Sequence, residues 1–341
     1  MTSVTPVEAL QRIAFLLERG REPTYRVRAF RGAAATVEAL ATGELEARIA
    51  AGTLRELAGI GEVTEKVILE AARGETPGYL TKLETEHGEP MSGGGEHIRA
   101  LLRGDCHTHS DWSDGGSPIR EMAEAATALG HEYMVLTDHS GRLTIAKGLD
   151  RDRLMAQLDV VARLNQELAP FRILTGMEVD ILEDGTLDMG HEVLSQLDVV
   201  VGSVHSKLRM EAPAMTQRMI TALTDPDLDI LGHCTGRIVV GRGRPESTFD
   251  PELVFAVAAR FDKAIEINSR PERLDPPIRL LQMVVAAGCK VSIDTDAHAP
   301  GQLDWLDHGC ARAAECDVPV ESIVNTMGAD ELLAWARSHD D

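Results

Sequence analysis

Two histidines and an aspartate lie close together in the segment GDCHTHSDWSD, residues 104–114. His107 and His109 are two residues apart, and Asp114 follows five residues later. Because alternate residues of a β-strand point to the same face, the two imidazoles can converge on one metal ion. Imidazole and carboxylate groups bind Zn, Mn and Fe alike, so the segment predicts metal chemistry without fixing the metal.

The same residue types recur at the carboxyl ends of later apolar runs, for example YMVLTD, LDILGH and KVSIDTD. Burying many such groups without compensation is costly, and metal ions are the natural compensation. Nine ligands exceed the need of one or two tetrahedral sites, so we expect three divalent metal ions, with Glu178 bridging. The predicted ligands are His107, His109, Asp114, His139, Glu178, His205, His233, Asp296 and His298.

Other histidines and aspartates have neighbours typical of linkers, helices, turns or the chain end. We expect no ligand role for His87, His97, His131, His191, His308, His339, Asp184, Asp188 and Asp198.

Seven apolar runs alternate with helical patterns in the second part of the chain. The first precedes His107, and the others end at Asp138, Glu178, His205, His233, Asn268 and Asp296. This alternation predicts an α/β fold of parallel strands joined by crossover helices, in a seven-stranded barrel with an irregular seam. Chemistry in such barrels lies at the carboxyl ends of the strands, where the predicted ligands fall.

Charge divides the chain of 341 residues into two unequal parts. The net charge is −21, yet residues 1–83 are neutral, with 11 Lys/Arg and 11 Glu. The glycine-rich stretch HGEPMSGGGEH suggests a boundary. We therefore expect a helical domain at 1–86, a linker at 87–98 and a barrel at 99–341. The acidity argues against a surface that coats nucleic acid throughout.

Five cysteines form no CxxC pair, which indicates reduced thiols. No signal peptide or membrane-length apolar run is present, so we expect a cytoplasmic protein with no membrane partner.

The first part predicts helices over residues 6–19, 26–40 and 44–51. In LRELAGIGEVTEKV a helix is expected to end near Ala58, and a tight Gly59-Ile60-Gly61 turn precedes the next helix. This is a helix-hairpin-helix pattern, whose glycines let backbone amides approach a phosphate. An ordinary helical hairpin is the alternative.

A basic cluster in this part, Arg19 to Arg31, favours DNA contact, whereas Glu62 and Glu65 oppose it. Lys66 is either an amine nucleophile or an ordinary surface lysine. The predicted DNA-binding residues are Gly59, Gly61, Arg26, Arg28 and Arg31.

Six short motifs, HTH at 107–109, TDH at 137–139, GME at 176–178, SVH at 203–205, GH at 232–233 and DTDAH at 294–298, resemble the polymerase-and-histidinol-phosphatase (PHP) superfamily. TDHSGRLTIAKGL and EINSRPERLD are similar to the carboxyl-terminal domain of bacterial family X DNA polymerases. LLERGREPTYRVRAFRGAA and LAGIGEVTEKV resemble their amino-terminal helix-hairpin-helix domain. The nucleotidyltransferase region between these domains is replaced by about ten residues, so polymerase activity is not expected.

The resemblance implies a distorted seven-stranded barrel, a trinuclear metal centre and phosphoesterase activity by a metal-activated water. It assigns His107, His109, Glu178 and Asp296 to one metal, Asp114, His139 and His298 to a second, and Glu178, His205 and His233 to a third. Glu178 and Asp296 are thus expected to be catalytic. Lys207 and Arg237, beyond strand ends, are candidates to bind phosphate oxygens, and Arg270 and Arg273 are weaker ones.

Three functions are consistent with these observations. The first is a phosphoesterase that processes DNA ends, as a 3′–5′ exonuclease, 3′-phosphatase or abasic-site nuclease. The second is a phosphatase of small monoesters such as histidinol phosphate, and the third is a non-catalytic DNA-binding module. The sequence does not indicate an oligomeric state.

Overall fold

A computed structural model describes residues 4–89 and 93–340 of the chain. The chain divides into two units, Met1–Met91 and Ser92–Asp341. Each unit has its own buried apolar cluster. Of the segment predicted as a linker, residues 87–98, His87 ends a helix of the first unit and residues 96–98 belong to a helix of the second.

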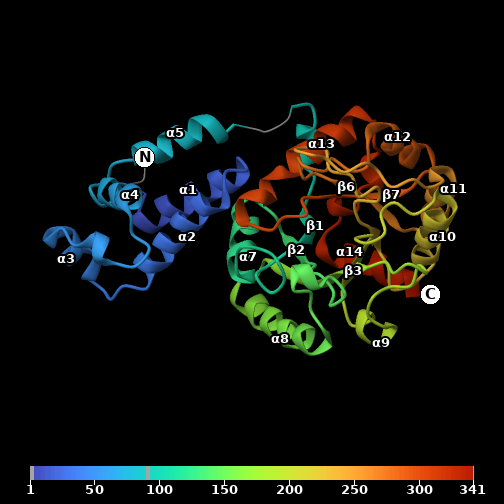
Figure 1. Ribbon diagram of the computed structural model, residues 1–341, viewed down its shortest axis with the longest axis horizontal. Coiled ribbons are helices and arrows are strands. Elements are labelled where there is room, and N and C mark those ends of the chain that lie inside the picture. Colours follow the sequence, from blue (N-terminus) through green and yellow to red (C-terminus); the bar gives the residue numbers. More distant parts are fainter. Residues whose placement is uncertain (1–3, 90–92, 341) are drawn as a thin grey trace. The chain divides into compact units, whose positions relative to one another are not determined.

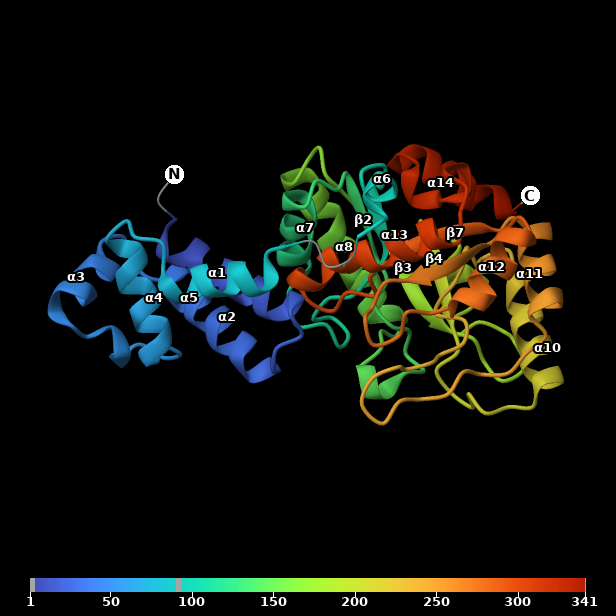
Figure 2. The same ribbon diagram turned by 90° about the horizontal axis from the view of Figure 1, so that it is seen from above.

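The first unit is all-helical, and α1 packs against α2, α4 and α5 (Figure 2). Thr5 begins α1 with a capping box, in which its side chain and that of Glu8 each bond the other residue's backbone amide. The elements are α1 (Pro6–Arg19), α2 (Thr24–Glu38), α3 (Glu44–Ala51), the 3₁₀ turn η1 (Leu54–Glu56), α4 (Glu62–Ala72) and α5 (Gly78–His87).

The three helices predicted first are confirmed, with α2 starting two residues earlier than expected. The helix predicted to end near Ala58 is wrong: α3 ends at Ala51, and only the single turn η1 precedes the glycines. Gly52 explains the early end, because its φ of 65° is left-handed and stops α3.

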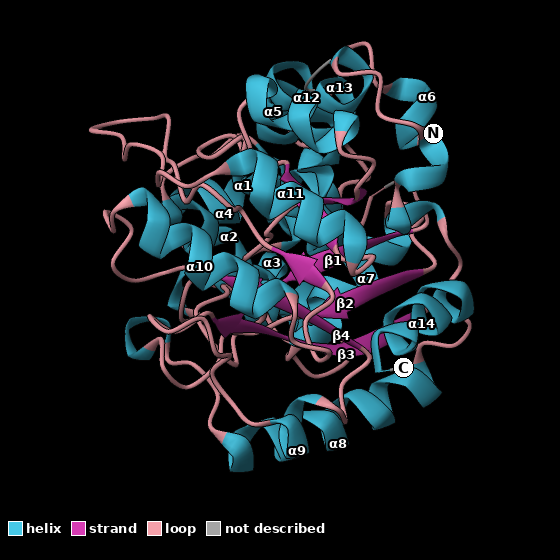
Figure 3. Ribbon diagram, turned by 90° about the vertical axis from the view of Figure 1, so that its right-hand side faces the viewer, coloured by secondary structure: helices cyan, strands magenta, loops and turns pink. Residues whose placement is uncertain are grey.

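The second unit is built on seven parallel strands in the order β1 to β7 (Figures 1 and 3). Every neighbouring pair is parallel, so all seven carboxyl ends lie at one rim. The strands are β1 (Gly104–Thr108), β2 (Tyr133–Leu136), β3 (Arg172–Asp180), β4 (Val199–Ser203), β5 (Ile230–Leu231), β6 (Ala264–Asn268) and β7 (Lys290–Asp294). The predicted seven-stranded α/β barrel is confirmed.

The barrel closes at a seam between β1 and β7. A single bridge joins Thr108 to Ala297 there. The buried side chain of Asn325 replaces ordinary strand pairing: its amide donates to the carbonyl oxygens of Gly104 and Ile293, and its oxygen accepts from the Ile293 amide. One side chain therefore ties the first strand to the last.

Helices lie around the strands (Figure 3). They are α6 (Glu96–Arg99), α7 (Ile119–Ala128), α8 (Arg151–Glu167), α9 (His191–Leu194), α10 (Ala212–Leu223), α11 (Pro251–Arg260), α12 (Ile278–Ala286), α13 (Leu306–Glu315) and α14 (Ala329–Arg337). Short 3₁₀ turns are η2 (Thr144–Ala146), η3 (Pro300–Trp305), η4 (Val320–Ser322), η5 (Val324–Thr326) and η6 (Ser338–Asp340). Within residues 4–89 and 93–340, no helix has both the length and the apolar character needed to cross a bilayer.

Candidate metal centre

The carboxyl rim of the barrel gathers all nine predicted ligands. Those nearest β1 and β7 come from opposite ends of the unit's sequence, and the seam brings them together. Asp114 is the most exposed of the nine, with 38% of its side chain accessible, whereas His107, His109 and Glu178 are fully buried. The rim is therefore a nearly dry site with one open side.

Glu178, in β3, lies at the centre of the imidazoles. Its Oε1 is 2.9 Å from His233 Nε2 and 3.2 Å from His205 Nε2. Its Oε2 is 2.8 Å from His139 Nδ1 and 3.3 Å from His107 Nε2. The two carboxylate oxygens thus face different sets of nitrogen atoms, as expected of a bridging ligand.

A second group of ligand atoms surrounds Asp114 on the open side. Asp114 Oδ1 lies 3.5 Å from His139 Nε2 and 3.4 Å from His298 Nε2. Beside them, His109 Nε2 is 3.5 Å from Asp296 Oδ1. Asp114 therefore approaches a different set of nitrogens from its sequence neighbours His107 and His109.

Several of these polar atoms are buried without a hydrogen-bond partner. They are His107 Nε2, both ring nitrogens of His109, His139 Nδ1, Glu178 Oε2 and His233 Nδ1. His139 Nδ1 and Glu178 Oε2 are close, yet their orientation does not make a hydrogen bond. Unsatisfied buried polar atoms are costly, and a cation placed between them removes that cost.

Three groups of described residues have ligand atoms within 4.8 Å of one another and could hold metal ions. These groups are His109, Asp114, His139 and His298; His107, His109 and Glu178; and His139, Glu178 and His205. The donor set of imidazole and carboxylate suits divalent transition metals. The residues present therefore fit a metal centre.

Two further carboxylates contact the Nδ1 atoms of two histidines that are predicted ligands. Glu266 Oε1 lies 2.6 Å from His107 Nδ1, and Asp180 Oδ1 lies 2.6 Å from His205 Nδ1. A carboxylate at Nδ1 keeps the proton there and leaves Nε2 as the donor atom for a metal. Sequence reasoning missed both, although Glu266 carried a signal as a charged residue inside the buried run AIEIN.

The carboxylates and imidazoles at this rim shift one another's pKa values. Burial alone would raise the pKa of Glu178, but the surrounding imidazoles, His139 first, hold it well below its ordinary value. Burial alone would lower the pKa of His205, but Glu178 and Asp180 raise it to about 9. Glu178 is thus kept ionised, the form of a carboxylate that binds metals.

Asp138 positions the loop that carries Asp114. This buried carboxylate accepts hydrogen bonds from the amide and hydroxyl of Ser110, from the Ser113 hydroxyl and from the Gln157 amide. Four donors satisfy it, so it acts as an anchor for residues 110–114 and is not a ligand.

A cavity of about 430 Å³ opens above the centre. Its floor contains six of the predicted ligands, and its walls combine arginines with aliphatic side chains. The wall residues are Leu143, Ile145, Ala146, Ile238, Arg244, Arg270, Glu272 and Arg273.

The cationic side chains that line the cavity are not the two that the sequence favoured for phosphate binding, Lys207 and Arg237. Lys207 is exposed, and the Arg237 guanidinium donates to the carbonyl oxygens of Arg273 and Leu274, which fixes that loop. Neither residue lines the cavity. Arg270 and Arg273 do, and they contact Asp296 at 3.5 and 3.1 Å.

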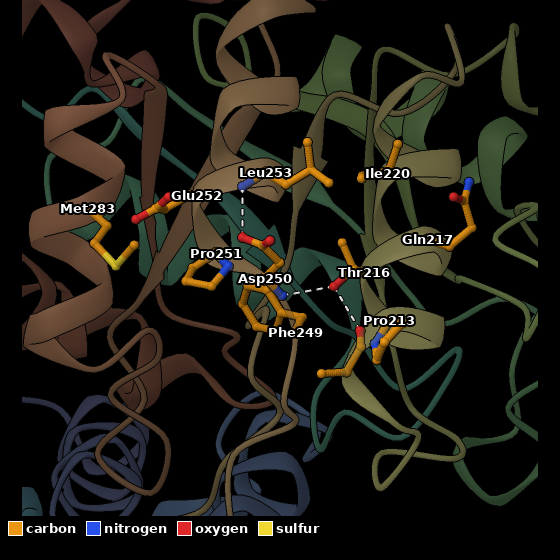
Figure 4. Close-up of a pocket in the computed structure, with 11 residues that line it drawn as sticks. Pro213, Thr216, Gln217, Ile220, Phe249, Asp250, Pro251, Glu252, Leu253 and Met283 are labelled. Atoms are coloured by element: carbon orange, nitrogen blue, oxygen red, sulfur yellow. Dashed lines mark hydrogen bonds between the residues drawn. The ribbon is translucent and has the colours of Figure 1, made fainter.

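A larger cavity of about 670 Å³ lies between α10, α11 and α12 (Figure 4). Its polar groups are used within the fold: Asp250 caps α11, and Thr216 accepts from the Asp250 amide while donating to Ala212. It contains no histidine or cysteine, and none of the three candidate metal groups reaches it.

The histidines expected to be inert stay outside the three metal groups in the described chain. His191 and His339 pair with Asp227 and Asp229 at the opposite end of the strands. Asp198 accepts hydrogen bonds from Thr175, which is a structural role.

In the helical unit, the glycine turn has the predicted tight geometry. Gly59 has a φ of 80°, and the Gly61 amide donates to Thr64 Oγ1. Two predicted DNA-binding arginines are engaged inside the unit: Arg26 with Glu22 and Tyr79, and Arg31 with Glu18.

Arg28 is exposed and makes no ion pair within 4.0 Å among the described residues. Lys66 is exposed and lies 3.8 Å from Glu70, as expected of a surface lysine.

Comparison with known proteins matches both units. The PHP domain model matches residues 105–273, and a helix-hairpin-helix domain model matches residues 2–76. The chain is 38% identical to the DNA polymerase/3′-5′ exonuclease PolX of Bacillus subtilis over 70% of this chain and 42% of that protein. It thus spans less than half of that relative.

Other relatives are named as phosphatases. A probable phosphatase of Aliivibrio fischeri is 30% identical over 64% of this chain and 87% of that protein. The solved structure of a putative histidinol phosphatase from Listeria monocytogenes aligns with a TM-score of 0.45 and 17% identity, over 59% of this chain and 97% of that one.

The matched domains and the relatives agree with the geometry of the rim. A metal-dependent phosphoesterase hydrolyses phosphate esters with water, and the buried imidazole–carboxylate cluster could hold metal ions for such a reaction. The chain belongs to the PHP family of phosphoesterases and carries a helix-hairpin-helix domain ahead of its PHP barrel.

Proposed function

We propose that this phosphoesterase acts on DNA ends, as a 3′–5′ exonuclease, 3′-phosphatase or abasic-site nuclease. The observation that carries the proposal is the pairing of a PHP barrel with a helix-hairpin-helix unit, together with 38% identity to a polymerase/3′-5′ exonuclease. The helical unit would bind the DNA backbone through the turn at Gly59 and Gly61 and through Arg28.

The proposed centre contains three divalent ions of Zn, Mn or Fe. His107, His109, Glu178 and Asp296 would hold one, and Asp114, His139 and His298 a second. Glu178, His205 and His233 would hold the third. The cations would supply neutralisation of phosphate charge and a water molecule of lowered pKa.

The chain's own side chains then orient the ester. The Nη1 atom of Arg273 is buried without a hydrogen-bond partner beside the cavity, so it can donate to a non-bridging phosphate oxygen. Arg270 holds Asp296 and the His298 ring through its Nη1 and keeps both at the cavity floor. Glu266 and Asp180 keep the Nδ1 protons of His107 and His205 in place.

Small phosphate monoesters are the second candidate substrate. The relatives named as probable phosphatases and the net charge of −21 favour it. Histidinol phosphate represents this class.

A direct comparison separates the two substrates. Purified protein with Mn²⁺ should shorten or dephosphorylate a labelled single-stranded oligonucleotide faster than it releases phosphate from histidinol phosphate. Turnover of histidinol phosphate without any change in the oligonucleotide would overturn the proposal. Removing residues 1–91 should reduce DNA processing about tenfold while hydrolysis of a small ester stays within about twofold.

We further propose a cytoplasmic location. All five cysteines are free and buried, as expected in a reducing compartment.

A further inference from the structure

The cavity above the metal centre has two walls that metal chemistry does not require. One is the turn η2 with its neighbours, residues 143–146, and the other is the loop at residues 238–244. Both present aliphatic side chains toward the same opening, and the second also presents Arg244.

Ile145 is the most exposed large apolar side chain described, at 89% accessible. Its turn is nevertheless firmly held: Arg153 Nη1 donates to the carbonyl oxygens of Lys147 and Gly148. The Arg142 amide also donates to Asp188. A rigid turn that exposes an isoleucine beside a polar site is typical of a ligand contact.

The opposite wall is equally ordered. Ile238 and Arg244 exchange two backbone hydrogen bonds across the loop, at 3.0 and 2.8 Å. Ile238 faces the cavity, and the adjacent Val239 is 50% exposed. The two walls thus offer an apolar slot open to solvent.

Arg244 adds a positive charge that the fold does not neutralise. Its Nε donates to the Gly236 carbonyl oxygen at 2.5 Å, and no carboxylate among the described residues pairs with it. Arg273 Nη1, on the same cavity, is also without a hydrogen-bond partner. One phosphate group at the centre would engage Arg273 and leave Arg244 for a second anion.

We propose that residues 143–146 and 238–244 bind a polynucleotide end, with the terminal base between Ile145 and Ile238 and the neighbouring internucleotide phosphate on Arg244. This inference rests on the proposed function and defines the substrate as a nucleotide chain carrying at least two phosphates. Because aliphatic side chains can contact any base, we expect the enzyme to show only a weak preference for the identity of the terminal base. Among the described wall residues of the cavity, Glu272 is the one carboxylate, and it already lies 3.7 Å from Arg270. A leaving group that carries an ammonium would therefore face the positive charge of Arg244 without a carboxylate to pair with.

Two substrate analogues, used with the 341-residue protein, test Ile145 and Arg244 separately. One oligonucleotide lacks its terminal base, and a second has a neutral methylphosphonate at the linkage next to the scissile one. Ile145→Ser should lower kcat/KM on the normal oligonucleotide about fivefold. Arg244→Gln should lower it about tenfold.

The expected signature is non-additivity. Ile145→Ser should cause no further loss on the oligonucleotide without a base, and Arg244→Gln none on the methylphosphonate. Leu253→Ser and Arg260→Gln, which lie outside this cavity, serve as matched controls. Full additivity of variant and analogue would overturn the inference while DNA processing itself persists. A wild-type protein inactive on every oligonucleotide would instead reject the proposed function, and the inference with it.

Discussion

The two units treat their buried charges in opposite ways. In the helical unit, the buried carboxylate of Glu18 pairs directly with the guanidinium of Arg31, at 2.9 Å. At the barrel rim, Glu178 meets five imidazoles, and several of the atoms involved have no hydrogen-bond partner. Charges that are fully paired indicate a structural role, whereas converging polar groups without hydrogen-bond partners indicate a candidate binding site.

The largest expected effect comes from the carboxylate at the centre of the rim. Glu178→Gln should remove most bound metal and lower kcat about a thousandfold or more, because a neutral amide cannot bridge cations. Elemental analysis and phosphate release measure the two effects. Glu183→Gln, at an exposed position, is the control. Normal metal content in the Glu178 variant would contradict its bridging role.

Chelation of metal should change the melting temperature of one unit and not of the other. Removing metal should lower the melting temperature of the barrel by about 10 °C, because metal binds only the folded rim. The transition of the helical unit should not move, since none of the three candidate metal groups found among the described residues lies in it. Calorimetry with and without a chelator gives both temperatures. A parallel shift of both transitions would mean that the helical unit also depends on metal.

A smaller effect on metal affinity is expected at Glu266, which contacts the Nδ1 atom of His107. Glu266→Gln should weaken metal affinity about 10- to 100-fold, because His107 loses the partner that fixes its Nδ1 proton. Glu252→Gln is a matched control on α11. Competition with a chromophoric chelator reports affinity independently of turnover. Restored affinity in Glu266→Asp would support a positioning role, and unchanged affinity in Glu266→Gln would exclude it.

The smallest effects contrast two arginines of the helical unit. Arg31→Ala should destabilise this unit by about 2 kcal/mol, because it removes a guanidinium that pairs with the buried Glu18 at 2.9 Å. Arg28→Ala should leave stability unchanged but reduce the salt dependence of DNA binding by about one ion. Denaturant unfolding and fluorescence anisotropy test the pair. Loss of stability in Arg28→Ala would show that it, too, is structural.

Much of the barrel was predictable, because the spacing of apolar residues and the polar residues at the end of each apolar run can be read from the local sequence. Each apolar run became a strand, and the residues that follow the runs, such as His139 and His205, gather at one rim. The roles of Asp180 and of the partly buried Arg244 were not predictable, because they depend on side chains far away in sequence, and the buried position of Glu266 did not reveal its partner His107. Lys207 and Arg237 show the same limit: their sequence positions resemble that of Arg273, but neither lines the cavity.

The seam at Asn325 also sets an order of events during synthesis. The first strand, with His107, leaves the ribosome long before β7 and Asn325, which complete the closed barrel. The helical unit can fold early because its contacts are local, whereas the rim stays incomplete until the last fifth of the chain has been made. A chain truncated before Asn325 is therefore expected to retain the helical unit but lack a formed metal centre.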